Sequence, residues 1–145
     1  MIRCEAFRRM VCCVVMTMVT MQVQAKHPAS PLQPTTIKDW HAAGMDGTGC
    51  YWSARRNGPV FFAASGRTAL TKIAGRVVVL APAPRSREMF PFTHDAWTSD
   101  RVDLRVIAGR RIRALGEETV TTDATLIVTF AGETRQLRGS MICGS

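Results

Sequence analysis

Two cysteines bracket almost all of the chain that has the pattern of a folded domain. Cys50 and Cys143 lie beyond a leader-like start, which holds the other three cysteines. In an oxidising compartment such a pair is normally a structural disulfide. It would close a loop of about 90 residues and, through loop-closure entropy, contribute about 4–5 kcal/mol to stability. A redox pair or a metal site fits less well, because those sites use closely spaced cysteines or a cluster with histidine.

Residues 1–25 have the pattern of a cleaved secretory signal peptide. Three arginines within residues 1–10 precede an apolar run over residues 10–21, and Val23 and Ala25 supply small residues at the −3 and −1 positions of a cleavage site. An apolar run of about 12 residues is too short to cross a bilayer as a helix, which takes about 20. We therefore expect an exported protein, periplasmic or secreted, with no transmembrane span after cleavage. An uncleaved anchor is the alternative.

Residues 26–48 have the composition of a flexible spacer, with three prolines near their start. Thr36 and Asp39 form the pattern of a capping box, which predicts a short helix over residues 37–43 that ends at Gly44. The remaining residues, 49–145, are expected to form one β-domain.

Beyond Cys50, short apolar stretches alternate with turn signals. Asn57-Gly58 is a strong two-residue hairpin signal. A repeated device, Ala-Gly followed by a charged residue, occurs at residues 74–76, 108–110 and 131–133 and predicts three more hairpins. These signals divide the domain into eight predicted strands, over residues 50–56, 59–64, 68–73, 76–81, 102–107, 110–115, 120–130 and 133–143.

The predicted strands alternate between apolar and polar residues, as in an antiparallel sheet with one face on a core. Residues 77–80 are apolar throughout and are expected to be covered on both faces. Eight strands in sequence order, with a disulfide between the first and the last, favour an antiparallel meander closed as a small barrel. An all-β sandwich of two sheets is the alternative.

One connection, residues 81–101, is too long for an ordinary loop and is the predicted binding surface. It contains aromatic and arginine side chains, the types enriched at binding hot spots. Two arginines of a later predicted hairpin would extend the surface. The candidate residues are Arg85, Arg87, Phe90, Phe92, Trp97, Arg111 and Arg113. The alternative is that the aromatic residues only cap an open end of the barrel.

The chain is basic, with 19 Lys and Arg against 11 Asp and Glu. This excess favours an envelope protein or an anionic surface as the partner. The alternative is that the arginines reflect genome composition alone. Nucleic acid is not expected as a partner, because the aromatic residues that stack on bases do not interleave with the arginines of the predicted strands.

Motifs of catalysis, metal binding and cofactor binding are not found, so we expect a binding protein with no catalytic, metal-binding or cofactor-binding residues. A hydrolase using His94, next to Asp95, is one alternative, although no nucleophile elbow is found. A carrier of a small apolar ligand inside the barrel is another. It requires an open interior lined by the alternating Val, Leu and Ile positions.

The layout, with Gly49-Cys50-Tyr51-Trp52 opening the domain and Cys143-Gly144 ending it, resembles small exported proteobacterial β-domain proteins whose function is not established. The resemblance covers residues 49–144 and implies no functional residues. The chain is also similar to periplasmic lysozyme inhibitors of the small barrel type, which bridge early and late strands. It departs from their Ser-Gly-x-x-Tyr loop, since Arg67-Thr68-Ala69 follows Ser65-Gly66. Its charge would also repel lysozymes, which are generally basic.

Overall fold

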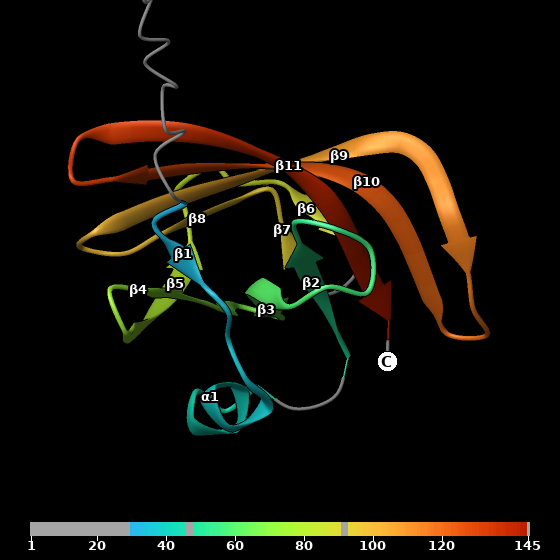
Figure 1. The fold of residues 1–145 in the computed structure, drawn as a ribbon, viewed down its shortest axis with the longest axis horizontal. Helices are drawn as coiled ribbons and strands as arrows, with labels where there is room; N and C mark the ends of the chain where they lie inside the picture. Colours follow the sequence, from blue (N-terminus) through green and yellow to red (C-terminus); the bar gives the residue numbers. More distant parts are fainter. Residues whose placement is uncertain (1–29, 46–47, 91–92, 145) are drawn as a thin grey trace, which may run out of the picture.

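The computed structural model describes residues 30–45, 48–90 and 93–144 (Figure 1), so the predicted signal peptide at 1–25 lies outside the described residues. Antiparallel strands dominate the fold. The strands in chain order are β1 (Leu32–Gln33), β2 (Gly49–Ser53), β3 (Val60–Ser65), β4 (Thr68–Ile73), β5 (Arg76–Pro82), β6 (Glu88–Phe90), β7 (Thr93–His94), β8 (Ala96–Thr98), β9 (Val102–Leu115), β10 (Thr119–Phe130) and β11 (Glu133–Gly144).

Eight of these strands close into a barrel, which confirms the predicted barrel over the sandwich. The order around the barrel is β4-β3-β2-β11-β10-β9-β8-β5, and β5 pairs with β4 to complete the ring. Cys50 of β2 and Cys143 of β11 lie opposite each other in register and form a disulfide, with 4.1 Å between their Cα atoms. The bond joins the first and last barrel strands, as predicted.

The interior of the barrel is filled by large side chains from the inner faces of the strands. Trp52, Phe62 and Trp97 are almost completely buried, and the rings of Phe62 and Trp97 meet edge to face at 6.3 Å. The indole nitrogens also have partners, since Trp52 Nε1 donates to the carbonyl of Ala124 and Trp97 Nε1 to that of His94. The volume that an apolar ligand would need inside the barrel is therefore occupied by the protein's own aromatic rings.

Two of the three Ala-Gly pairs form the predicted tight hairpins. In the β4–β5 turn Ala74 and Gly75 have φ of 49° and 76°, and in the β10–β11 turn Ala131 and Gly132 have φ of 52° and 78°. Two successive residues with positive φ are typical of the turn that matches the twist of a two-residue hairpin.

The hairpin predicted at Ala108-Gly109 is wrong, because β9 runs without a turn from Val102 to Leu115. Gly109 lies where the β9–β10 register shifts, and a Cβ there would come within 2.7 Å of the Asp123 carbonyl oxygen. This glycine therefore permits a close approach between strands at a bulge rather than a turn. The eighth barrel strand is β8 instead, which lies in the predicted loop 81–101.

Two further predictions also need correction. The Asn57-Gly58 turn does join β2 to β3, but β2 ends at Ser53 and β3 begins at Val60, so the connection is longer than two residues. A bulge opposite the end of β2 separates the strands before they reach the turn signal. Residues 77–80 are not covered on both faces, since the side chains of Val77 and Val79 are exposed. Only the inner face of β5 meets the core.

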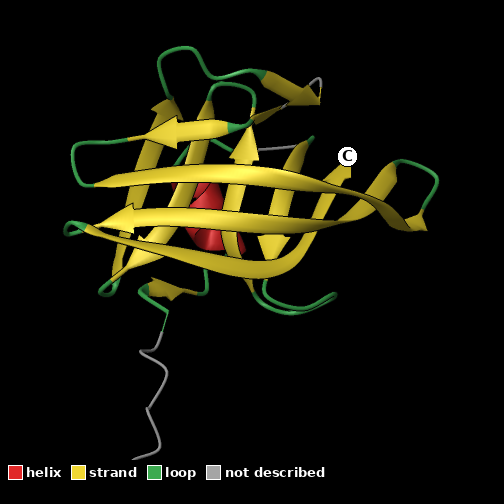
Figure 2. Cartoon of the chain, turned by 90° about the horizontal axis from the view of Figure 1, so that it is seen from above, coloured by secondary structure: helices red, strands yellow, loops and turns green. Residues whose placement is uncertain are grey.

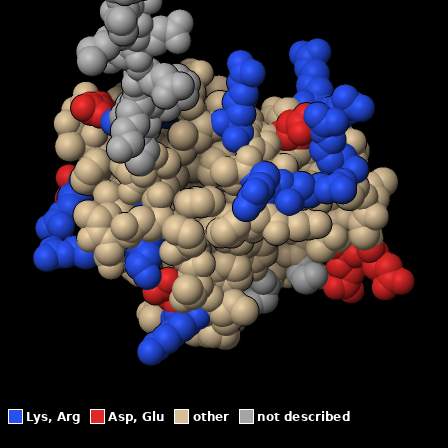
Figure 3. All heavy atoms as spheres, viewed as in Figure 1, with Lys and Arg blue, Asp and Glu red and all other residues tan. Residues whose placement is uncertain are grey.

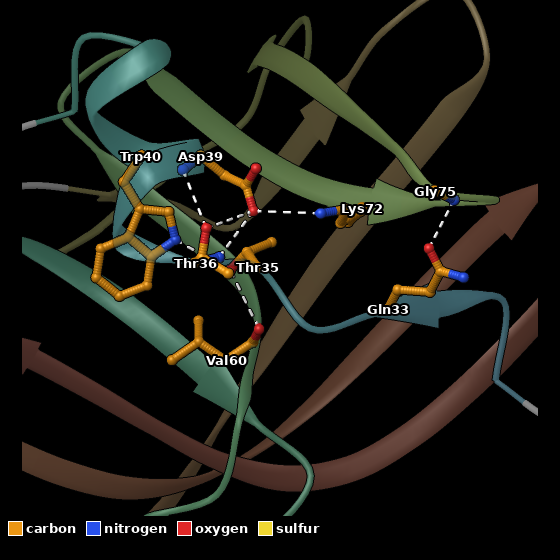
Figure 4. A network of polar contacts seen from close by, with 8 residues as sticks. All are labelled: Gln33, Thr35, Thr36, Asp39, Trp40, Val60, Lys72 and Gly75. Atoms are coloured by element: carbon orange, nitrogen blue, oxygen red, sulfur yellow. Dashed lines mark hydrogen bonds and ion pairs between the residues drawn. The ribbon is translucent and has the colours of Figure 1, made fainter.

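The described part of the predicted spacer is attached to the barrel, so it is not a flexible linker (Figure 4). β1 pairs with β4, and the side chain of Leu32 is buried in the main core. The predicted helix is confirmed as α1 (Ile37–Ala42), with both capping-box hydrogen bonds between Thr36 and Asp39. Sequence patterns alone did not show the attachment, because a two-residue strand carries no periodicity.

The helix covers the outer side of β2–β4 and lies outside the barrel next to β3 (Figure 1). Trp40 stacks on Tyr51 at 4.7 Å, and Met45 packs against Ala63 and Leu70 in a small second core. This side of the barrel is therefore closed by the chain itself.

On another side the three long strands β9, β10 and β11 cross the whole molecule (Figure 2). β9 pairs with β8 only over residues 103–105, while its ladder with β10 continues to Leu115. Beyond Val106 no strand of the described residues pairs with the other edge of β9. The end of the β9–β10 hairpin consequently stands beyond the barrel as an exposed extension.

Candidate functional site

The structure separates the residues of the predicted loop surface. Trp97 is completely buried in the barrel core, so it cannot form part of a surface and the prediction for it is wrong. Its place on the inner face of β8 is the reason. Phe92 and the side chain of Phe90 lie outside the described residues. Arg85 and Arg87 are exposed, as predicted, and they lie beside β9.

Three adjoining hollows run along the outer side of β9 and form one groove. The first, of about 300 Å³, lies between residues 84–87 and Arg105. The second, of about 470 Å³, lies between residues 87–89 and residues 105–108. The third, of about 350 Å³, lies over Gly109 at the bend of β9. Neighbouring hollows share lining residues, and we call them together the β9 groove.

Five arginines line the β9 groove: Arg85, Arg87, Arg105, Arg113 and Arg138. They come from the segment before β6, from β9 and from β11. The strand register brings Arg138 to the groove. Arg138 of β11 lies opposite Thr125 of β10, and Thr125 lies opposite Ile107 of β9. At about 3.3 Å per residue, the stretch of β9 from Arg105 to Arg113 gives the groove a length of up to about 26 Å.

Two of the five arginines have carboxylate partners. Asp95 accepts hydrogen bonds from the backbone N–H of Arg87 at 2.7 Å and from its Nε at 3.4 Å. Asp123 accepts from Nε and Nη2 of Arg113, both at 2.7 Å. The hydrogen bond from Arg113 lowers the pKa of Asp123 below its ordinary value, and the nearby charge of Arg111 acts in the same direction. Asp123 therefore holds Arg113 by two short hydrogen bonds, whereas the side chain of Arg87 has one long contact and stays 81% exposed.

The other three arginines of the groove carry charges that nothing in the described structure neutralises. Arg85, Arg105 and Arg138 have no ion pair or side-chain hydrogen bond among residues 30–45, 48–90 and 93–144. In Figure 3 basic side chains gather over the part that Figure 1 draws as the β9–β10 extension, and acidic ones gather at its turn, which contains Glu117 and Glu118. Three carboxylates, Glu88, Asp95 and Asp123, also line the groove, so its five arginines leave it with a net positive charge.

The sequence pointed to part of this site. It predicted Arg85, Arg87 and Arg113, and the structure brings all three to the groove, while Arg111 lies nearby on β9. Arg105 was not among the candidate residues, and it lies on the same strand as Arg111. Arg138 was missed, because no local pattern shows that β11 lies two strands from β9.

One further pair of side chains bears on the hydrolase alternative. Ser86 Oγ lies 3.4 Å from Nδ1 of His94, a long separation for a hydrogen bond. The neighbouring carboxylate of Asp95 holds Arg87, and no carboxylate contacts the His94 ring within the described part of the chain. The arrangement therefore lacks the third group that orients the base in a catalytic triad.

Within the described ranges, no three His, Cys, Asp or Glu side chains gather as a metal-binding group. No described helix has the length and hydropathy to cross a membrane. No protein-family model, no curated protein and no solved structure matches this chain. The resemblances noted from the sequence therefore stay predictions, and the function has to be argued from the β9 groove.

Proposed function

We propose that this protein is an exported, non-enzymatic binding protein that holds an anionic partner along the β9 groove. The observation that carries the proposal is the row of three unpaired arginines, Arg85, Arg105 and Arg138, along one continuous groove. Unpaired guanidinium groups retain their full capacity to bind carboxylates or phosphates in a bidentate manner. The site differs from the predicted one because it combines the basic part of loop 81–101 with β9 and β11.

The length of the groove indicates the form of the partner. Charges spread over up to about 26 Å suit an extended polyanion better than a single small ion. Arg87 and Arg113 have carboxylate partners in Asp95 and Asp123, so the charge that is open to a partner comes from the unpaired arginines.

Two other observations support the proposal. The Cys50–Cys143 disulfide is the kind of bond that persists in oxidising compartments, which agrees with export. The carrier alternative has little support, since Trp52, Phe62 and Trp97 fill the barrel. We therefore favour binding at the outer surface of the barrel over transport of a ligand inside it.

The test measures the affinity of the whole exported domain for polyglutamate by fluorescence anisotropy at about 50 mM and about 300 mM sodium chloride. The double variant Arg105→Gln/Arg138→Gln should bind about tenfold more weakly than the unmodified protein, since exposed charge pairs contribute about 0.2–1 kcal/mol each. The double variant Arg67→Gln/Arg76→Gln is the matched control, because it removes the same charge from exposed residues away from the groove. Equal loss in both variants would show that net charge, rather than the groove, binds the probe.

A further inference from the structure

The middle of the β9 groove contains a free strand edge. The backbone N–H of Val106 donates to the carbonyl of Asp95 at 2.8 Å, and this bond is the last one between β9 and the β8 side. The β9–β10 register is unbroken from Val102 to Ala108. Because backbone groups alternate in direction along a strand, the N–H and C=O of Ala108 point to the same side as those of Val106. The N–H of Val106 is bonded to Asp95, but no strand of the described residues pairs with the C=O of Val106 or with the N–H and C=O of Ala108.

The groove has room for another strand at this edge. Its middle hollow, of about 470 Å³, lies between Met89 and the edge residues Ile107 and Ala108. That volume is within the range of about 300–1,000 Å³ that is typical of ligand sites. Met89 is half-buried against the main core and Ile107 is half-exposed, so both can contact an apolar side chain of a strand laid between them.

The charged side chains beside this edge favour some partner strands over others. Arg105 lies before it, and Arg110 and Arg111 follow it on β9, all exposed. Two copies of this edge paired with each other would place arginines near arginines, and like charges on adjacent strands are destabilising. The arginines would instead attract acidic side chains placed at the two ends of the edge, since Glu88 and Asp95 line the middle hollow itself. A second copy of the chain is therefore disfavoured at this edge.

We propose that an extended acidic segment of a protein partner adds to the barrel as a strand along Val106–Ala108, with its acidic side chains on the arginines of the β9 groove. This inference rests on the proposed function and names its partner class. Backbone hydrogen bonds supply affinity in such strand addition, and side chains supply specificity. An anionic polysaccharide would use the arginines but could not form this ladder.

The probe is a labelled octapeptide of alternating glutamate and valine, whose extended length matches the groove. Its matched control has the same sequence with N-methyl groups on alternate backbone amides, which keeps the charge and removes hydrogen-bond donors from one edge. Both registers of methylation are made, because either edge of the peptide can face β9. Strand addition predicts that one methylated peptide binds about tenfold more weakly, because it loses the two hydrogen bonds that its N–H groups would donate to the carbonyls of Val106 and Ala108. The other should bind much as the parent does.

A variant of the protein tests the same contact from the other side. Ala108→Pro removes an N–H that faces the free edge, a position where a strand tolerates proline. Ala108→Val keeps the N–H and is the matched control. The proline variant should keep the circular dichroism spectrum of the unmodified protein and its affinity for sulfated dextran, which has no backbone amides. It should bind the Glu-Val octapeptide about fivefold more weakly, as expected for one lost hydrogen bond.

The outcomes separate the two proposals. If all octapeptides bind equally and Ala108→Pro has no effect, while Arg105→Gln/Arg138→Gln still weakens polyglutamate, strand addition is refuted and the basic groove remains. Binding of sulfated dextran without binding of any acidic peptide would likewise refute a protein segment as the partner. If neither polyanion responds to the arginine substitutions, the proposed function itself fails. If Ala108→Pro does not fold, the methylated octapeptides decide alone, and equal binding of both to the unmodified protein refutes strand addition.

Discussion

Removing the Cys50–Cys143 disulfide tests how the barrel is closed at its first and last strands. The double variant Cys50→Ala/Cys143→Ala keeps the hydrogen-bonded register between β2 and β11, from Ser53 opposite Ser140 to Gly49 opposite Gly144. It loses the covalent closure of a loop with a sequence separation of 93. Loop-closure entropy for that length corresponds to about 4.6 kcal/mol at 25 °C. Typical domains are stable by about 5–15 kcal/mol, so the loss should be a large share of the total.

The assay is urea unfolding followed by tryptophan fluorescence. With a urea dependence of about 2 kcal/mol/M, the midpoint should fall by about 2 M, and the dependence itself should rise because the unfolded chain can expand further. Reductant should change the midpoint of the unmodified protein but not that of the double variant, which is the control. A midpoint that falls by less than about 0.5 M would refute the reasoning, because the ladder alone would then hold the barrel closed.

Other substitutions test the core, an ion pair and a turn. Trp97→Ala should cost about 3–5 kcal/mol in urea unfolding, as expected for a buried aromatic residue, and a cost near zero would place Trp97 on the surface. Arg113 lowers the pKa of Asp123, so stability from this pair is complete above the ordinary carboxyl pKa and is lost as the pH falls through the lowered value. Asp123→Asn should abolish that part of the pH dependence of unfolding, and an unchanged profile would contradict it. Gly132→Ala should cost about 1 kcal/mol in urea unfolding, because alanine resists the positive φ of this turn, and no loss would contradict it.

The three Ala-Gly pairs have the same local sequence, but two of them form turns and one lies within a strand. The pairs at residues 74–75 and 131–132 join strands that are adjacent in sequence and form turns. The pair at residues 108–109 has the same local sequence but lies against Asp123 of β10, where the strand bends at a bulge and continues without a turn. Tertiary packing, not local propensity, decides between the two outcomes. The prediction from the cysteines was confirmed, because a disulfide requires the two strands that carry the cysteines to lie close together.

Only some residues of the candidate site could be predicted from the sequence. Arginines of the long connection could be identified because long connections often carry function. Trp97 has the same sequence environment, yet it faces the core, because a three-residue strand is too short to show alternation. Arg138 reaches the β9 groove only through the register of three strands. Such a surface is assembled from distant segments and leaves no contiguous signal in the sequence.

The most direct test of the central claim is a map of where an anionic partner binds. Titrating the isotope-labelled protein with the Glu-Val octapeptide, and following backbone amide signals by NMR, locates the contact residue by residue. The account predicts that the largest shifts occur at Arg87, Arg105, Ala108 and Gly109, which lie along the β9 groove. Shifts confined to the opposite side of the barrel, around Arg67 and the helix α1, would contradict it.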